Sequence, residues 1–239
     1  MKRYIRTAVT NVSDEDIYSR REIANKTDDV YLLRQLSEDK DPEIRSRVAR
    51  NQHTPIDILL KLTEDPIIPV REYLMMRDEV LPLEVQMALA SNTPGLRKLL
   101  LQYEDVDTEI INLLSNDEND IVREMAAIKP RLSDENKIRL SNDKDKYVRY
   151  ELAKNRRLPL DIVVKLSTDD YDAVRIVIAG RQDTPAEILD KMSYDDFENV
   201  RSMVAYNKNT PITTLKRLLK DKSERVQSFA RDNLEQRGQ

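Results

Sequence analysis

Charged residues that could act in catalysis recur along this chain at a fixed interval. An arginine stands every 26 residues, and an aspartate stands six residues before most of these positions. The arginines are Arg45, Arg71, Arg97, Arg123, Arg149, Arg175 and Arg201, and the aspartates are Asp39, Asp65, Asp117, Asp143, Asp169, Asp195 and Asp221. Paired carboxylates could serve as general acid and base, but a charge repeated in every unit is explained more simply by a ladder. Because a planar guanidinium binds carboxylates in a fixed fork, we predict that each arginine binds carboxylates of its own and the adjacent unit.

Two departures from the pattern fit a structural role for these charges. Asn92 takes the aspartate place in the one repeat whose loop is a residue shorter. Gln227 replaces the arginine at the last step, where no further repeat follows.

Other kinds of active site find little support in the sequence. There is no cysteine, which excludes disulfides, thiolate metal sites and cysteine nucleophiles. The single histidine, His53, falls in a predicted turn and is expected to be a surface residue rather than a metal ligand or a triad base. With three glycines in the whole chain, no glycine-rich phosphate loop is present. We therefore predict a protein that is not an enzyme and that holds no metal or cofactor.

The residues between the repeated charges indicate pairs of short helices. Apolar residues spaced for one helical face occur in 44–49 and again in 58–62. Asn51 is placed to end the first helix in a left-handed conformation. Thr54 and Pro55 then match a helix start, with threonine as the N-cap and proline at the first helical position. Two helices of about 8 to 11 residues per repeat leave no room for strands.

The repeat also divides the chain. Residues 1–19 match no repeat and are predicted to form an N-terminal capping segment, in which residues 13–16 resemble a helix start capped by Ser13. Residues 20–226 form the array of about eight repeats, and residues 227–239 form a C-terminal capping helix and tail. Self-similarity of this kind predicts an all-α solenoid.

One copy of the repeat carries a family resemblance. The pattern Val-Arg-x-x-Val-Ala-x-Asn-x-x-Thr-Pro-x-x-x-Leu-x-x-Leu, from Val200 to Leu218, resembles the bacterial leucine-rich repeat variant proteins and, more broadly, the HEAT-like repeats. The resemblance covers roughly residues 20–235 and implies a right-handed superhelical solenoid. Founding members of the variant family carry a cysteine-bound iron–sulfur domain, a role that a chain without cysteine does not share.

Enzymes built on HEAT-like repeats show features that this chain lacks. The metal-dependent hydroxylases rely on His-Glu pairs, whereas this chain has one histidine. The alkylpurine DNA glycosylases use a basic face with tryptophan and a catalytic aspartate, whereas this chain has no tryptophan and a net charge of -4. The resemblance therefore implies the fold of this chain and neither of these activities.

A row of cations occupies positions that the repeat does not fix, just before the last leucine of each second helix. This basic row consists of Lys61, Arg139, Lys165, Lys191 and Arg217. Neutral residues, Ala88 and Leu113, interrupt it in the acidic middle of the chain. Such a row could bind phosphates or an acidic partner. The simpler explanation is that each cation complements the C-terminal dipole of its own helix, and we prefer it.

These observations favour a non-catalytic scaffold that binds a protein or peptide along its solenoid surface, on a concave face. The alternative is a nucleic-acid-binding module that uses the basic row. Tyrosines are scattered over different repeat positions and form no stacking row for single strands. No run of apolar residues is long enough to cross a membrane, so the predicted location is the cytoplasm. The oligomeric state is left open.

Overall fold

A computed structural model describes residue 12 and residues 15–103 and 105–238. Within these residues the chain forms α-helices joined by short turns, and no strand occurs. The odd-numbered helices are α1 (Ile17–Lys26), α3 (Pro42–Arg50), α5 (Ile68–Leu74), α7 (Pro94–Gln102), α9 (Asp120–Ala127), α11 (Lys146–Ala153), α13 (Asp172–Gly180), α15 (Glu198–Tyr206) and α17 (Glu224–Gln236). The even-numbered helices are α2 (Val30–Leu36), α4 (Ile56–Leu62), α6 (Leu83–Ala90), α8 (Thr108–Leu114), α10 (Asp134–Leu140), α12 (Leu160–Leu166), α14 (Ala186–Met192) and α16 (Ile212–Leu218). The predicted all-α class is confirmed.

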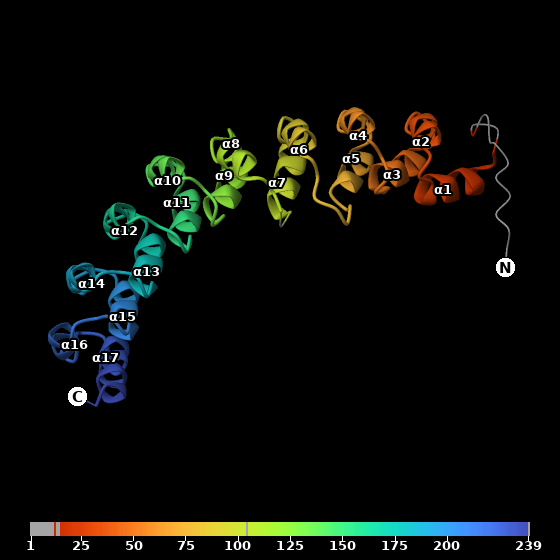
Figure 1. Ribbon diagram of the computed structural model, residues 1–239. Coiled ribbons are helices and arrows are strands. Elements are labelled where there is room, and N and C mark those ends of the chain that lie inside the picture. The colour runs from red at the N-terminus through yellow and green to blue at the C-terminus, as the bar shows by residue number, and fades with distance from the viewer. Residues whose placement is uncertain (1–11, 13–14, 104, 239) are drawn as a thin grey trace. The chain divides into compact units, whose positions relative to one another are not determined.

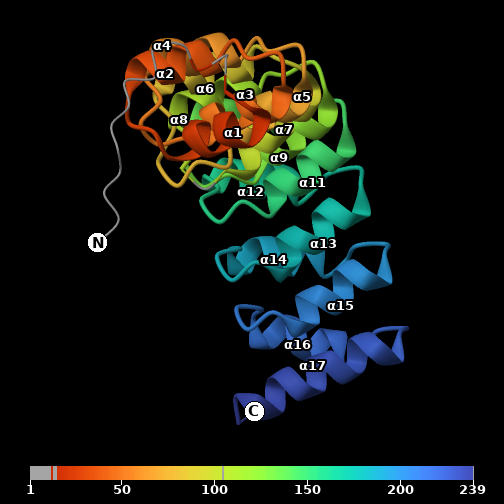
Figure 2. The same cartoon turned by 90° about the vertical axis from the view of Figure 1, so that its right-hand side faces the viewer.

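The chain divides into two compact units, residues 1–110 and residues 111–239, with α8 at the boundary. Within each unit the odd-numbered helices form one layer and the even-numbered helices form a second layer beside it (Figure 1). Within each unit an odd-numbered helix packs on the next one, as α1 does on α3 in the first unit and α13 does on α15 in the second. Figure 2 looks onto the odd-numbered layer of the second unit.

The core lies between the two layers and is built from the apolar positions of the repeat. Val174 and Ile178 of α13 are fully buried, four residues apart on one face of the helix. Leu189 of α14, in the other layer, is also fully buried. Because the same positions are buried in each repeat, each repeat closes its core only against its neighbours.

The helix ends differ from the sequence prediction in three respects. Asn51 ends α3 in an extended conformation, with φ -64° and ψ 123°, so the predicted left-handed residue is wrong. Pro55, not Thr54, is the N-cap of α4. The Thr54 hydroxyl instead donates a 2.6 Å hydrogen bond to the Val48 carbonyl, which closes the end of the preceding helix. The even-numbered helices also have 7 or 8 residues, shorter than most of the predicted range.

The start of the array differs as well. The N-cap of α1 is Asp16, whose carboxylate accepts from the amides of Tyr18 and Ser19. Ser13, the predicted cap, lies outside the described residues. The predicted boundaries after residues 19 and 226 fall inside α1 and α17, and the division into caps and array stays a prediction.

Candidate functional surfaces

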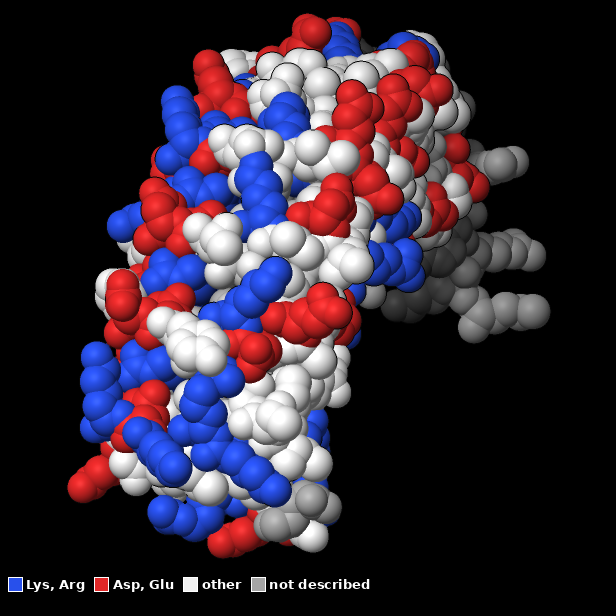
Figure 3. Space-filling view, turned by 90° about the vertical axis from the view of Figure 1, so that its left-hand side faces the viewer, with Lys and Arg blue, Asp and Glu red and all other residues white. Residues whose placement is uncertain are grey.

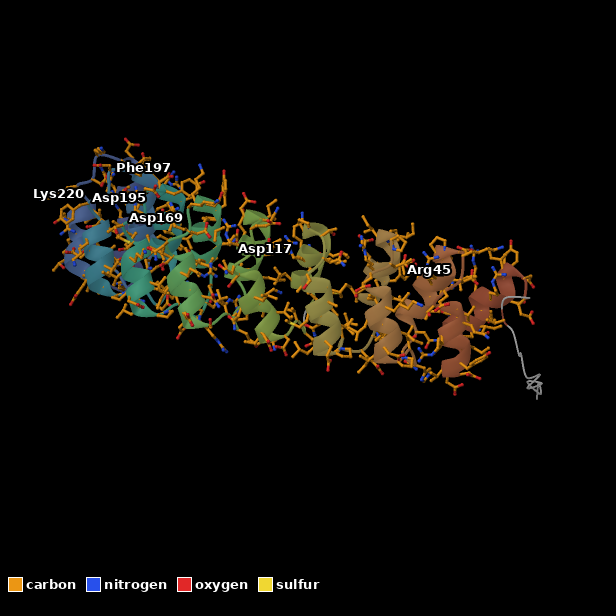
Figure 4. All side chains as sticks on the ribbon, turned by 90° about the horizontal axis from the view of Figure 1, so that it is seen from above. Arg45, Asp117, Asp169, Asp195, Phe197 and Lys220 are labelled. Atoms are coloured by element: carbon orange, nitrogen blue, oxygen red, sulfur yellow. The ribbon has the colours of Figure 1, made fainter. Side chains whose placement is uncertain are left out.

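The repeated arginines and aspartates meet in pairs that join consecutive repeats. Arg149 donates from Nε to Asp169 Oδ2 at 2.7 Å and from Nη2 to Asp169 Oδ1 at 2.9 Å. The same fork-shaped contact recurs as Arg45 with Asp65, Arg123 with Asp143, Arg175 with Asp195 and Arg201 with Asp221. Arg20 contacts Asp39 through Nε at 2.8 Å. Asp169 and Asp195, from successive repeats, are labelled in Figure 4.

Each arginine of the ladder also binds its own repeat, but through the backbone. Arg149 Nη1 donates to the Asp143 carbonyl at 2.8 Å, not to the Asp143 carboxylate. The expectation that the fork binds carboxylates of both units is therefore wrong: the carboxylate comes from the next repeat and the carbonyl from its own. Each aspartate in turn caps its own loop, as when Asp169 Oδ1 accepts from the Tyr171 amide at 2.9 Å. The pair thus fixes the turn that starts each odd-numbered helix.

Burial and hydrogen bonding have opposite effects on the pKa of Asp169, and hydrogen bonding prevails. The side chains of Arg149 and Asp169 are 11% and 7% exposed. Burial works to raise the pKa of Asp169, but the bonds from Arg149 and the Tyr171 amide outweigh it and lower the pKa below its ordinary value. The hydrogen bond to Asp169 correspondingly raises the pKa of Arg149. Both groups are therefore ionised at neutral pH, held as a structural ion pair.

The ladder changes where the sequence changes. Asn92 stands in place of a carboxylate and donates its side-chain amide to the Thr63 carbonyl at 2.9 Å. In the same region Arg71 Nε finds no hydrogen-bond acceptor among the described residues. At the last step Gln227 keeps the backbone contact, donating from Nε2 to the Asp221 carbonyl at 2.7 Å.

Asparagines form a second ladder, which the sequence analysis did not identify. Asn207 is fully buried, and its amide donates to the carbonyls of Ala179 and Arg181 in the preceding repeat, each at 2.7 Å. Equivalent contacts are made by Asn51, Asn155 and Asn233. Arg77 and Arg181 fill the same place in their repeats and donate from a guanidinium to the equivalent carbonyls of the preceding repeat. The signal was present in the sequence as asparagines at multiples of 26, broken by these substitutions.

Most of the basic row is engaged with the preceding repeat. Lys61 pairs with Glu38, and Lys165 contacts the side-chain oxygen of Asn142. Arg139 is half-buried and donates at 2.8 Å to both the carbonyl and the hydroxyl of Ser115. Arg217 donates to Asp190 at 2.8 Å and lies 4.1 Å from the centre of the Tyr194 ring. Lys191 is exposed, with no ion pair among the described residues.

Acidic side chains interrupt the positive charge of this region. Figure 3 looks onto the even-numbered layer, where Lys and Arg side chains gather over the C-terminal repeats with Asp and Glu among them. A hollow of about 360 Å³ there is lined by Arg217, Lys220 and Lys222, but also by Asp195, Asp196 and Asp221. The surface is therefore mixed in charge rather than a continuous cationic stripe.

The outward side of the odd-numbered helices in the second unit carries apolar and aromatic side chains. This outward face lies opposite the buried positions of each helix. Its apolar and aromatic members are Ile128, Tyr150, Ile176, Val177, Met203, Tyr206 and Phe229, and Glu124, Glu151 and Lys154 stand at equivalent repeat positions. Tyr206 is 63% exposed, and its ring meets Phe229 edge-on with centroids 5.8 Å apart. The corresponding residues in the first unit are Ser46, Arg47 and Arg50 on α3 but Glu72, Tyr73 and Met76 on α5, so there this side is polar on α3 and mixed on α5.

The described part of the chain assembles no cluster of metal ligands. His53 is an exposed turn residue, and its ring lies beside the Gln52 amide. Among the described residues, no three His, Asp or Glu side chains gather as metal ligands do. The helices seen there are also too short and too polar for any of them to cross a membrane.

Comparison with known proteins identifies the fold. No protein-family model matches the sequence, and no curated protein matches it. Among solved structures, the chain is similar to a leucine-rich repeat variant with a novel repetitive structural motif, with a TM-score of 0.68 and 20% identity over 91% of this chain and 83% of that one. The predicted α-solenoid of two-helix repeats, with the fold of the leucine-rich repeat variant, is confirmed.

Two designed proteins are more distantly similar. A designed armadillo repeat protein is 14% identical, covering 87% of this chain and 99% of its own, with a TM-score of 0.30. A structure of computationally designed armadillo repeat proteins for modular peptide recognition is 14% identical, covering 94% and 95%, with a TM-score of 0.27. These values are too low to bear on the function of this chain.

Proposed function

We propose that this protein is a non-catalytic scaffold that binds a protein or peptide partner on the outward face of its second unit. One contrast carries the proposal. The charged side chains of the ladder bind neighbouring repeats, whereas Tyr206 and its apolar neighbours remain at the surface. Aromatic side chains and methionine are enriched at protein interfaces, because they supply large contact areas.

The alternative is binding of a nucleic acid or another polyanion through the basic row. The observation in its favour is that Lys191 is exposed without an ion pair among the described residues, and lines a hollow together with Arg175. Against it, Lys61 and Arg217 are already paired with carboxylates, and phosphate binding would have to compete with those contacts. We therefore favour a protein partner. The cytoplasmic location also stays a prediction.

Affinity purification with two matched variants separates these functions. The first variant changes Tyr206 to glutamate on the outward face, and the second changes Arg139, Lys165, Lys191 and Arg217 together to glutamine. A protein partner on the outward face should survive nuclease treatment, be lost from Tyr206→Glu and be retained by the quadruple variant. The polyanion alternative would instead be established if the captured material is lost after nuclease treatment or from the quadruple variant, and if its retention falls steeply as salt rises.

A further inference from the structure

An apolar groove crosses the outward face between α11, α13 and α15. Its walls are Ile176 and Val177 of α13 and Met203 of α15, all half-buried. Its volume is about 730 Å³, within the range of roughly 300–1,000 Å³ typical of ligand sites. The space is therefore large enough for a short segment of another molecule.

A glycine opens this groove. Gly180 occupies the position held by Lys154 one repeat earlier and by Tyr206 one repeat later. A Cβ atom at Gly180 would lie 3.2 Å from Met203 Sδ, so the methionine packs directly on the bare backbone of α13. Because no side chain projects from α13 at this point, a depression remains where the adjacent repeats carry long side chains.

The charges at the rim of the groove favour an acidic occupant. Arg181 is neutralised by Asp183, to which it donates from Nε at 2.8 Å and from Nη2 at 2.7 Å. Lys154 donates to both carboxylate oxygens of Glu151 at 2.8 Å. Arg156 is exposed and makes no ion pair with any residue that the structure describes. One positive charge is thus left at the edge of an apolar depression.

We propose that this depression, the Gly180 groove, binds an extended peptide segment of the partner. The segment inserts a leucine, methionine or phenylalanine side chain beside Gly180, between Ile176 and Met203, and places the carboxylate of a neighbouring Asp or Glu against Arg156. This inference rests on the proposed function and adds the location and the chemistry of the recognised segment. The backbone of an extended peptide suits the groove because its side chains alternate between wall and solvent.

A defined peptide tests the proposal without knowledge of the partner. The probe is the capped peptide Gly-Ser-Leu-Glu-Ser-Gly, titrated into full-length protein whose isoleucine and methionine methyl groups are isotope-labelled for NMR. We expect saturable shifts at Ile176 and Met203. Replacing the peptide leucine by serine should abolish them, because the apolar side chain supplies most of the contact. Replacing the glutamate by lysine should weaken binding about two- to fivefold, and the difference should shrink at high salt.

Protein variants provide the matched control. Ile176→Lys should weaken the peptide by at least about tenfold, since it puts a charge where the anchor side chain is buried. Leu160→Lys makes the same kind of change at a 58% exposed residue on α12, in the other layer, and should leave binding unchanged. Circular dichroism of both variants reports whether the helices are retained.

Three outcomes overturn the proposal. The first is the absence of shifts at Ile176 and Met203 at millimolar peptide, and the second is an equal loss of peptide affinity in both protein variants. The third is shifts that grow with protein concentration alone, which would assign the groove to a second copy of the chain. The groove can fail while the proposed function stands. A partner that is captured through Tyr206 but is indifferent to Ile176→Lys would remove the groove from the account and leave the scaffold in place.

Discussion

Replacing Arg149 with alanine should destabilise the second unit by about 2–4 kcal/mol. The substitution removes two hydrogen bonds to Asp169, one to the Asp143 carbonyl and one to the exposed carboxylate of Asp170. Breaking a fully buried ion pair from one side costs about 3–5 kcal/mol, because the remaining charge stays buried without a partner. The Asp169 side chain is 7% exposed, so some water can enter the vacated space and the expected loss is slightly smaller.

The assay is urea unfolding followed by far-ultraviolet circular dichroism, together with hydrogen exchange resolved by peptide. A loss of this size should lower the melting temperature by roughly 5–15 °C. Exchange should increase in α11 and α13, the helices that follow Asp143 and Asp169, more than in α3. The end of the ladder supplies the control, because Gln227 makes a single hydrogen bond to a carbonyl. Gln227→Ala should cost about 0.5–1.5 kcal/mol.

A double-mutant cycle makes the test specific to the pair. Asp169→Asn keeps an acceptor for the Tyr171 amide while removing the negative charge. If Arg149 acts through Asp169, the two substitutions should be strongly non-additive, with a coupling of about 1–3 kcal/mol. Additive effects, or losses from Arg149→Ala and Gln227→Ala that agree within about 0.5 kcal/mol, would refute the ladder as the source of stability.

The remaining predictions concern the stability at low pH, the asparagine ladder and the threonine contacts. Because the folded pKa of Asp169 lies below the unfolded value of about 3.9, its contribution is present above that pH and is lost as the pH falls through the folded pKa. The difference in urea midpoint between the wild type and Arg149→Ala should therefore narrow below about pH 4, and a constant difference would contradict the pKa assignment. Asn207→Ala should cost about 1–3 kcal/mol in urea unfolding, because one buried and one partly buried carbonyl lose their donor. The adjacent exposed Lys208→Ala should change stability by less than about 0.5 kcal/mol, and equal effects would show that the amide contacts contribute nothing. Thr184→Val should cost about 1 kcal/mol through loss of the 2.6 Å bond to the Ile178 carbonyl, whereas Thr184→Ser should retain most of it.

The sequence predicted the rows of the ladder but not how they connect. With a period of 26 residues, an aspartate six residues before one arginine is also the aspartate twenty residues after the previous one. Spacing alone therefore cannot say which carboxylate a guanidinium reaches. The direction in which the Arg149 side chain leaves α11 decides this, and that direction follows from packing.

Local helix signals were less reliable than the period. The Thr54-Pro55 pair is compatible with a helix that starts at either residue, since proline tolerates both the N-cap and the first helical position. The structure resolves this through the hydroxyl, which donates to the helix behind it. The Gly180 groove could not be read from the sequence either. A glycine leaves the same signal whether it opens a groove or ends a helix, and the difference depends on where Met203 lies.

Photo-crosslinking at two equally exposed tyrosines tests the central claim most directly. Tyr206 lies on the outward face and is 63% exposed, whereas Tyr194 lies in the turn that follows α14 and is 66% exposed. Benzoylphenylalanine at each position preserves an aromatic side chain, so both variants should fold. The account predicts adducts with a specific protein at Tyr206 and none with that protein at Tyr194. Adducts at Tyr194 alone, or crosslinks to nucleic acid at Tyr194 with none to protein at Tyr206, would contradict it.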